Sequence, residues 1–251
     1  MVVCAFCEKS TSSDVEHVIG KWLSRLLNPD STGIFRVESQ YPARQWKSRE
    51  VSLVTRSVCR DCNSGWMSRL ESDVKPILSP MIHGETSQLS LESQKLITTW
   101  LLKTAFVVDV QGADVTKESF FTQSERELFR QSHRSSPCYW GQACLGRYSG
   151  RLVHVLPQHL TFFDEIGYPR SQAYCLSLVL GPLVAQLLMY RPKHGEPSLV
   201  CMGERKADWH LATLPVWPAT QMVTWPPVQS FDDAGIKALH DRYDCLPNLN
   251  Q

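Results

Sequence analysis

Four cysteines in the first quarter of the chain form two closely spaced pairs. Cys4 and Cys7 make one C-x2-C pair, and Cys59 and Cys62 make the second. Thiolates are soft ligands, a tetrahedral zinc ion needs four donors, and each tight turn presents two sulfurs on one side. The pairs therefore predict one structural zinc site. A redox role is the alternative, but a redox C-x-x-C usually follows a strand in a thioredoxin-like unit, and Cys4 lies too near the start of the sequence for one.

Three residues beside these pairs are not needed as zinc ligands. His17 lies ten residues after Cys7 and is preceded by Glu16, and Asn63 directly follows Cys62. Because four thiolates complete a tetrahedron, these side chains are left for other chemistry. Taken alone, Asn63 would be a favoured N-cap residue at the start of a helix, and Glu16 and His17 an ordinary surface pair. Their register with both cysteine pairs is what favours a functional site.

The order of these motifs resembles the HNH, or ββα-metal, endonucleases of treble-clef type. The pattern of that family is C-x2-C, then Asp or Glu followed by His, then C-x2-C followed at once by His or Asn; phage junction-resolving members carry the Asn. The segments EHVIGKWL and VCRDCNSGWMSRLE also resemble a group of bacterial HNH-like proteins, which often have proline where this chain has Gly20. The resemblance covers about residues 4 to 78.

The resemblance implies a role for each of these residues. His17 would act as the general base, since imidazole titrates near neutral pH and can accept a proton from water. Glu16 and Asn63 would offer hard oxygen ligands to a catalytic Mg²⁺ or Mn²⁺ ion, which would polarise the scissile phosphate. The zinc would stay structural and hold Asn63 at the head of a helix.

Basic residues gather between the two cysteine pairs. The chain as a whole has a formal net charge of +1, so it produces no global field that attracts nucleic acid. Residues 18 to 60 nevertheless contain only three acids against eight basic residues, which are Lys21, Arg25, Arg36, Arg44, Lys47, Arg49, Arg56 and Arg60. The expected nucleic-acid contacts are phosphate binding and base stacking by Arg44, Lys47, Arg49, Arg60 and Trp46. The alternative is a solvated loop that Trp46 anchors.

The organisation of the chain is typical of an α+β fold. We expect residues 1–80 to form a treble-clef zinc (ββα-metal) module whose two hairpin strands lie near residues 33–39 and 50–56. Pro76 and Pro80 are expected to close it, because each disfavours continuing a helix. Residues 81–251 are expected to form a helical segment followed by a mixed or antiparallel β-sheet.

Hydrophobic periodicity places the elements of this second part. Apolar residues at three- and four-residue steps predict a helix over 90–109, and a more polar helix is expected over 123–131. Short apolar runs after residue 138 predict strands, and residues 232–244 predict a closing helix. The uncharged run 171–190 is long enough for a membrane span, but Gly181-Pro182 interrupts it, so two buried elements joined by a turn are the better interpretation.

The remaining cysteines and histidines offer no recognised constellation. Cys138, Cys144, Cys175, Cys201 and Cys245 have no ligand spacing and are expected to be small buried hydrophobic residues. The histidines of the second half each lack a partner at a recognised spacing, namely His154, His159, His194 and His210.

These observations define three hypotheses for function. The first is a cytoplasmic, metal-dependent endonuclease that cuts nucleic acid, with DNA as the first candidate, in phage defence or another mobile-element setting. The second is a non-catalytic, zinc-stapled module that binds nucleic acid or protein. The third makes the C-terminal region a sensor for a small ligand that releases the nuclease. No leader sequence precedes the first cysteine pair, which favours a reducing compartment, and the C-terminal region is a candidate for oligomer or partner contacts.

Overall fold

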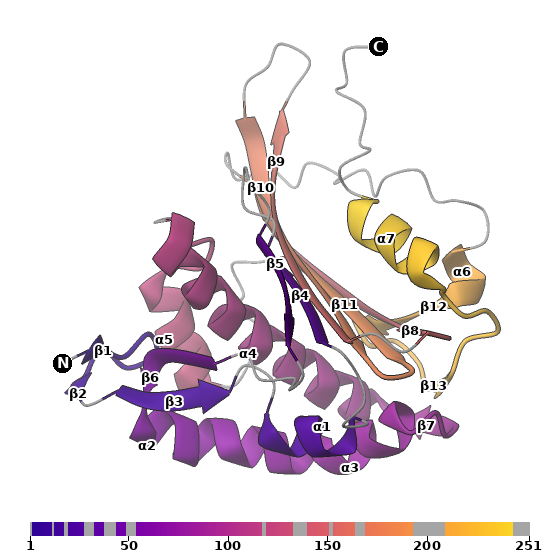
Figure 1. The fold of residues 1–251 in the computed structure, drawn as a ribbon, viewed down its shortest axis with the longest axis horizontal. Coiled ribbons are helices and arrows are strands. Elements are labelled where there is room, and N and C mark those ends of the chain that lie inside the picture. Colours follow the sequence, from indigo (N-terminus) through magenta and orange to yellow (C-terminus); the bar gives the residue numbers. More distant parts are fainter. Residues whose placement is uncertain are drawn as a thin grey trace.

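A computed structural model describes residues 2–11, 13–17, 20–27, 33–37, 44–48, 54–116, 119–132, 140–150, 153–163, 169–192 and 209–242. Its N-terminal part consists of β1 (Val2–Val3), β2 (Ser10–Thr11), β3 (Ser13–His17), α1 (Lys21–Leu26), β6 (Val54–Cys59), α2 (Arg60–Cys62), η1 (Asn63–Met67) and α3 (Ser68–Ile82). Two short antiparallel strands, β1 and β2, flank the first cysteine pair. Strands β3 and β6 form a second antiparallel pair, which leads directly into the helical run from α2 to α3 (Figure 1). This run is kinked at Gly65, whose φ of −89° and ψ of −108° are not helical.

A seven-stranded sheet forms the centre of the molecule. Its strands are β4 (Gly33–Val37), β5 (Arg44–Ser48), β8 (Trp140–Arg147), β9 (Val153–Phe163), β10 (Pro169–Leu180), β11 (Leu183–Pro192) and β12 (Thr213–Trp217), in the spatial order β12-β8-β11-β10-β9-β4-β5. β4 runs parallel to β9 and every other pair is antiparallel. β4 and β5 therefore come from the segment between the two cysteine pairs but complete a sheet whose other strands lie after residue 138.

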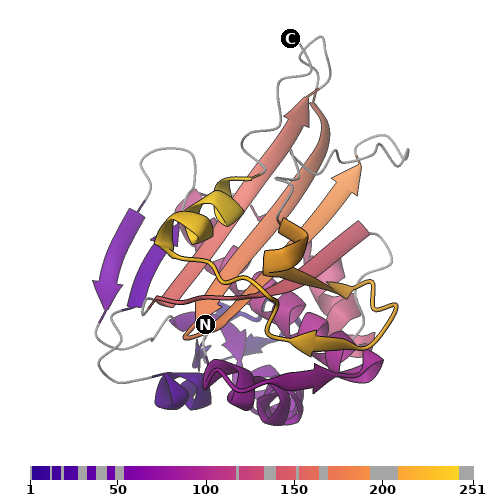
Figure 2. The same ribbon diagram turned by 90° about the vertical axis from the view of Figure 1, so that its right-hand side faces the viewer.

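Helices cover both faces of this sheet. The remaining elements are β7 (Ser87–Leu89), α4 (Leu91–Thr116), α5 (Gln123–Ser132), α6 (Trp209–Ala212), β13 (Val223–Trp225) and α7 (Asp233–Asp241). α4 packs between the sheet and α3, whereas α7 lies across the opposite face (Figures 1 and 2). The side chain of Gln186 on β11 donates to the backbone oxygen of Leu239, at a nitrogen–oxygen distance of 3.0 Å, and so fastens α7 to the sheet.

Burial on both faces explains why residues 173–180 of β10 are apolar apart from Ser177. Tyr174, Leu176 and Leu178 belong to the main core beneath α4, and Cys175 and Val179 belong to clusters on the opposite face. A strand covered on both faces is expected to carry a nearly continuous run of apolar residues. The uncharged run 171–190 is accordingly two buried strands, β10 and β11, and the turn between them uses Gly181 at φ 60°. None of the helices that the structure describes has the length and apolar character that crossing a bilayer requires.

Several predicted elements are confirmed with small changes in length. The helix expected over 90–109 is α4, which extends to Thr116, and the helix expected over 123–131 is α5. The closing helix is α7, where Asp232 is the N-cap and accepts from the backbone N–H of Gly235. The strand-rich second half is the central sheet. Of the other cysteines, Cys175 is buried and Cys144 half-buried, while Cys138, Cys201 and Cys245 lie outside the described residues.

Two predictions about the first eighty residues are wrong. Pro76 and Pro80 do not end a helix, because α3 runs through both to Ile82. Pro76 is exposed and Pro80 half-buried on the outer side of α3, where water can satisfy the carbonyls that lose their N–H partners, and the opposite side is buried in the core. The strands near 33–39 and 50–56 also do not pair with each other: β4 pairs with β5 and β9, and β6 pairs with β3.

Candidate metal centre and the residues beside it

The four paired cysteines converge on one point. The sulfur atoms of Cys4, Cys7, Cys59 and Cys62 all lie within 4.8 Å of one another, and those of Cys7 and Cys59 are 3.6 Å apart. A tetrahedron of sulfurs 2.3 Å from a zinc ion has edges of about 3.8 Å, so the cluster fits zinc in both donor chemistry and size. Among the described side chains it is the one group of three or more potential ligands that converges in this way.

Backbone N–H groups point at these sulfurs. Cys4 Sγ accepts from the N–H of Phe6 at 3.5 Å and of Cys59 at 3.3 Å, and Cys59 Sγ accepts from the N–H of Cys62 at 3.4 Å. Hydrogen bonds from Cys62 and from three backbone N–H groups lower the pKa of the Cys4 thiol to about 4, against the opposing effect of burial. The hydrogen bond to Cys4 raises the pKa of Cys62, because Cys62 retains the proton that the two sulfurs share. The cluster thus holds negative charge at neutral pH, and a bound cation would displace the remaining protons.

The cysteine cluster is built into the main core of the protein. Cys4, Cys59 and Cys62 are buried, and so is Phe6 between the first two ligands. The ring of Phe6 meets Trp66 edge to face with a centroid distance of 5.4 Å, and meets Phe106 of α4 at 6.2 Å. The cluster therefore joins the N-terminal segment to the helical core rather than forming a separate appendage.

Helix α5 holds the same segment from outside. The Nε of Arg126 donates to the backbone oxygen of Ala5 at 3.0 Å, and the Nε of Arg130 donates to that of Phe6 at 3.1 Å. Two guanidinium groups therefore fix the backbone between Cys4 and Cys7, which orients both sulfurs toward the cluster.

Cys59 has a second role as the cap of the helix that follows it. The helix begins at Arg60, and the sulfur of Cys59 accepts the N–H of Cys62, which is the usual bond of an N-cap side chain. Asn63 lies inside the helical run with φ −62° and ψ −59°. The alternative that Asn63 is the N-cap is therefore wrong, because Cys59 already occupies that position.

The backbone places Glu16, His17 and Asn63 on successive elements of one unit. Glu16 and His17 are the last residues of β3, opposite Thr55 and Val54 at the start of β6, and Asn63 is half-buried just after Cys62. β6 covers roughly 16 Å between Val54 and Cys59, at about 3.3 Å per residue. The side chains of Glu16 and His17 lie outside the described part of the chain, so their convergence with Asn63 stays a prediction.

The segment after His17 is anchored on helix α3. The Trp22 Nε1 donates to Glu71 Oε2 at 3.2 Å, and a Cβ added to Gly20 would lie only 2.5 Å from the same oxygen. Gly20 has φ −53°, which proline could also adopt, so glycine is not needed here for backbone freedom, and a larger residue would require the Glu71 and Trp22 side chains to shift. Glu71 is eight residues beyond Asn63, on the other side of the kink at Gly65.

The residues predicted to contact nucleic acid are divided between two parts of the fold. Arg44, Trp46 and Lys47 lie on β5, at the edge of the seven-stranded sheet, where their partners on β4 are Val37, Phe35 and Ile34. Their side chains and all of Arg49 lie outside the described residues. Arg60 is exposed in the first turn of the helix that follows Cys59.

One histidine thought to lack a partner has one. The Nε2 of His159 on β9 lies 3.3 Å from the buried carboxylate of Asp109 on α4. The same carboxylate accepts from Ser119 Oγ and from the backbone N–H groups of Phe120 and Phe121, so it holds the turn before α5. The only sequence signal for this group was an acid on the apolar helix 90–109, which gives no indication of a strand residue fifty positions later.

His154 illustrates a different environment on the α7 side of the sheet. Burial lowers its pKa, the nearby Asp233 opposes that effect, and His240 adds to it. His210 is exposed, and His194 lies outside the described residues.

The fold and the cluster together define an α+β protein with a four-cysteine centre that could hold a metal ion. Comparison with known proteins adds no closer assignment: no protein family, no curated protein and no solved structure matches this chain.

Proposed function

We propose that this chain is a metal-dependent endonuclease of the HNH type, built on a treble clef and acting on nucleic acid, with DNA as the first candidate. The observation that carries the proposal is the chain order around the cysteine cluster. A cysteine pair between short strands, an antiparallel strand pair and a helix that starts at the second cysteine pair follow one another, with His17 at the end of β3 and Asn63 directly after the second pair. That order is the one that the sequence motifs predict for this class.

In this proposal His17, the pair Glu16 and Asn63, and the four cysteines each have a separate role in the reaction. His17 takes a proton from the attacking water, for which neutral imidazole is suited near neutral pH. Glu16 and Asn63 supply the oxygen donors for a Mg²⁺ or Mn²⁺ ion, which when bound would offer Lewis-acid stabilisation of charge on the phosphate. The four cysteines keep β6 and the following helix in fixed relation, so that the carboxylate and amide are held before substrate binds.

The supporting geometry is local and specific. Cys59, and not Asn63, occupies the N-cap position of the helix, so capping does not account for an asparagine at position 63. Because Trp22 donates to Glu71, helix α1, which begins four residues after His17, is fastened to α3. Both features favour a preorganised site along the strand–helix boundary.

Plasmid cleavage tests the proposal. Zinc-loaded protein should nick supercoiled plasmid when Mg²⁺ or Mn²⁺ is added, and His17→Ala should lose at least about a hundredfold in rate, the usual contribution of a general base. The zinc content of His17→Ala should stay at one ion per chain. Cleavage by His17→Ala at the parent rate would remove the catalytic assignment.

A spectroscopic test separates the metal ligands from the activity. Paramagnetic Mn²⁺ should broaden the imidazole signals of His17 and the side-chain amide signals of Asn63. The exposed His83, at the far end of α3, should stay sharp and is the matched control. If the signals of both His17 and Asn63 stay sharp when Mn²⁺ is added, the second ion has no site between them.

A second candidate function has its own support. The cysteine cluster is packed into the core through Phe6 and Trp66 and needs no contribution from His17, so it could serve a purely structural purpose. A zinc-stapled binding module is therefore the alternative. It predicts nucleic-acid or protein binding with no Mg²⁺-dependent cleavage, whatever residue occupies position 17.

A further inference from the structure

Helix α1 presents a basic face to solvent. Lys21 and Arg25 are four residues apart, which places them on one side of the helix, and both are exposed. On the other side Leu23 and Leu27 are buried in the core. α1 contains no acidic residue, so its outer face carries two positive charges with no counter-charge of its own.

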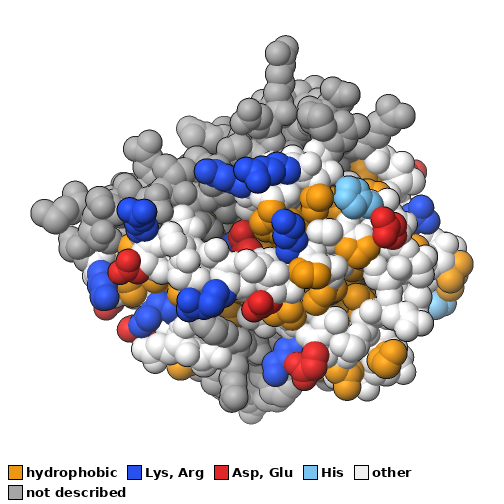
Figure 3. All heavy atoms as spheres, turned by 90° about the horizontal axis from the view of Figure 1, so that it is seen from below, with side chains coloured by type: hydrophobic (Ala, Val, Ile, Leu, Met, Phe, Trp, Pro, Cys, Tyr) orange, Lys and Arg blue, Asp and Glu red, His pale blue; other side chains and the backbone are white. Residues whose placement is uncertain are grey.

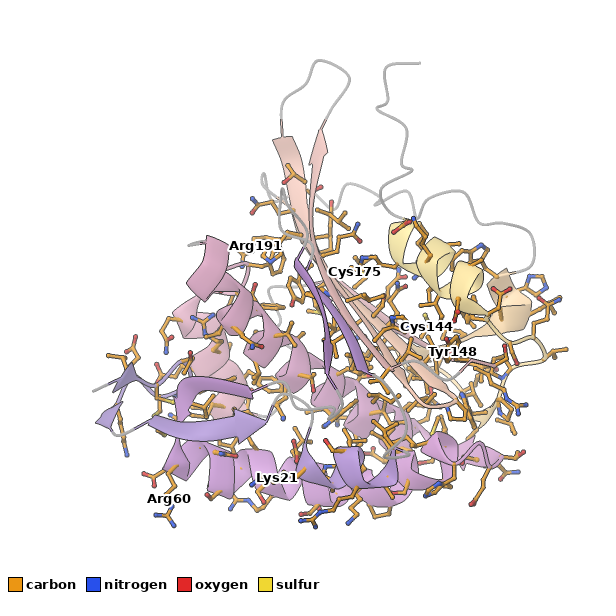
Figure 4. The ribbon with its side chains drawn as sticks, in the orientation of Figure 1. Lys21, Arg60, Cys144, Tyr148, Cys175 and Arg191 are labelled. Atoms are coloured by element: carbon orange, nitrogen blue, oxygen red, sulfur yellow. The ribbon has the colours of Figure 1, made fainter. Side chains whose placement is uncertain are left out.

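The start of the long helical run adds to this surface. Arg60 and Arg69 are exposed there, together with the hydroxyl-bearing Ser64 and Ser68. Lys21 and Arg60 both extend from the lower side of the molecule (Figure 4). Figure 3 looks onto that side and shows Lys and Arg side chains spread over it, with Asp and Glu side chains among them.

The nearest acid of this region is neutralised from inside. The Nζ of Lys103, which is fully buried in α4, lies 2.9 Å from Glu71 Oε1, and Trp22 binds the other carboxylate oxygen. Over residues 20–27 and 60–75, five exposed basic side chains then stand against two exposed acids, Asp61 and Asp73, a net charge of +3. The buried ammonium thus pairs with the acid of α3 that α1 contacts.

We infer that the outer face of α1 and the first turns of the helical run, defined by Lys21, Arg25, Arg60 and Arg69, binds the sugar–phosphate backbone of a nucleic-acid strand. Ammonium, guanidinium and serine hydroxyl groups donate hydrogen bonds to phosphate oxygens. The interaction is independent of sequence, because these groups reach backbone and not base edges. The inference rests on the proposed function. It locates the substrate on helices beside the cysteine cluster rather than on the β5 residues Arg44 and Lys47.

Binding can be measured apart from cleavage. Zinc-loaded full-length protein is titrated into a fluorescein-labelled DNA duplex with no added Mg²⁺ or Mn²⁺, over a series of salt concentrations. Lys21→Glu/Arg25→Glu should weaken binding by roughly tenfold or more and reduce the log–log salt slope by about two, because two phosphates are no longer neutralised. Lys21→Gln/Arg25→Gln should weaken binding less, in the same direction.

Two control variants make the result specific. Lys237→Glu reverses the charge of an exposed lysine on α7, across the sheet, and should bind as the parent does. Arg44→Ala tests the strand β5 surface with the same duplex. Circular dichroism and zinc content are compared for every variant, because α1 packs on the core.

Each outcome decides the inference. Weaker binding by the α1 variants, with parental binding by Lys237→Glu, supports the inference. If the parent protein binds the duplex in this way but never cleaves plasmid, only the nuclease proposal fails. The inference is overturned by an unchanged salt slope, by equally weak binding of Lys237→Glu, or by an effect confined to Arg44→Ala. Preference for an acidic peptide over the duplex would also overturn it, whether or not the parent cleaves plasmid.

Discussion

The ammonium group of Lys103 on α4 lies 2.9 Å from the carboxylate of Glu71 on α3, in a place where the lysine side chain is wholly buried and the glutamate side chain 17% exposed. Trp22 of α1 binds the second carboxylate oxygen. This one ion pair therefore joins three helices directly beneath the basic face of α1. A buried charge is costly unless it is paired and hydrogen-bonded, so the two residues depend on each other.

Glu71→Gln should destabilise the protein by about 3–5 kcal/mol, because it removes the carboxylate that balances a buried ammonium group. Lys103→Met should cost less, since the remaining carboxylate keeps Trp22 and partial access to water. Urea unfolding of both variants and of the double variant measures the coupling. The double variant should be less destabilised than the sum of the two; additivity would contradict direct pairing.

Cys59→Ser should abolish stoichiometric zinc binding and loosen the N-terminal unit, since Cys59 is both a ligand and the helix cap. Zinc released per chain by a mercurial reagent, read with a chromogenic chelator, is the measurement. Cys144→Ser changes a half-buried thiol on β8 outside the cluster and should retain the parent content. Full zinc occupancy in Cys59→Ser would mean that the cluster is not the site.

Asn63→Ala should leave stability within about 1 kcal/mol of the parent, because the cap belongs to Cys59 and not to Asn63. If Asn63 holds the catalytic ion, the same variant should need a higher Mg²⁺ concentration for plasmid cleavage. Thermal unfolding and a Mg²⁺ titration of cleavage are run on one preparation. A large drop in stability with an unchanged Mg²⁺ requirement would assign Asn63 a purely structural role.

Asp109→Ala should destabilise the protein by about 3 kcal/mol or more, because two backbone N–H groups of the turn before α5 lose their acceptor in a buried place. Asp109→Asn should be milder, since the amide keeps one acceptor oxygen. Ser119→Ala removes one of the donors and leaves the carboxylate, so it is the matched control. Equal stability of Asp109→Ala and Ser119→Ala would refute this account.

His154 should make the protein less stable in mild acid. Burial lowers its pKa in the folded state below the ordinary value of 6.5, so below that pH the unfolded chain binds a proton that the folded chain does not. Protonation therefore favours unfolding, and the penalty appears as the pH falls below about 6.5 and is absent above it. Urea midpoints of the parent and His154→Gln should differ in slope between mildly acidic and neutral pH; parallel curves would exclude the contribution of His154.

The sequence by itself determined those features that depend on neighbours along the chain. The spacing of the cysteines predicted one metal cluster, because two short turns present four sulfurs whatever surrounds them. The periodicity of 90–109 predicted α4, and Gly181-Pro182 predicted the turn between β10 and β11, since both follow from local backbone geometry. The register of Glu16, His17 and Asn63 with the cysteines gave a hypothesis for the catalytic site, and that hypothesis stays a prediction.

Only the tertiary structure decided which distant groups meet. β4 and β5 pair within the sheet of the second half, and α3 runs through two prolines. His159 lies beside the carboxylate of Asp109, and Lys103 beside that of Glu71. The helix is also capped by Cys59 rather than by Asn63, because the Cys59 sulfur accepts the N–H of Cys62. Pairing across a fold is selected by burial and by the need to satisfy buried polar groups, and neither is encoded in the spacing of residues along one segment.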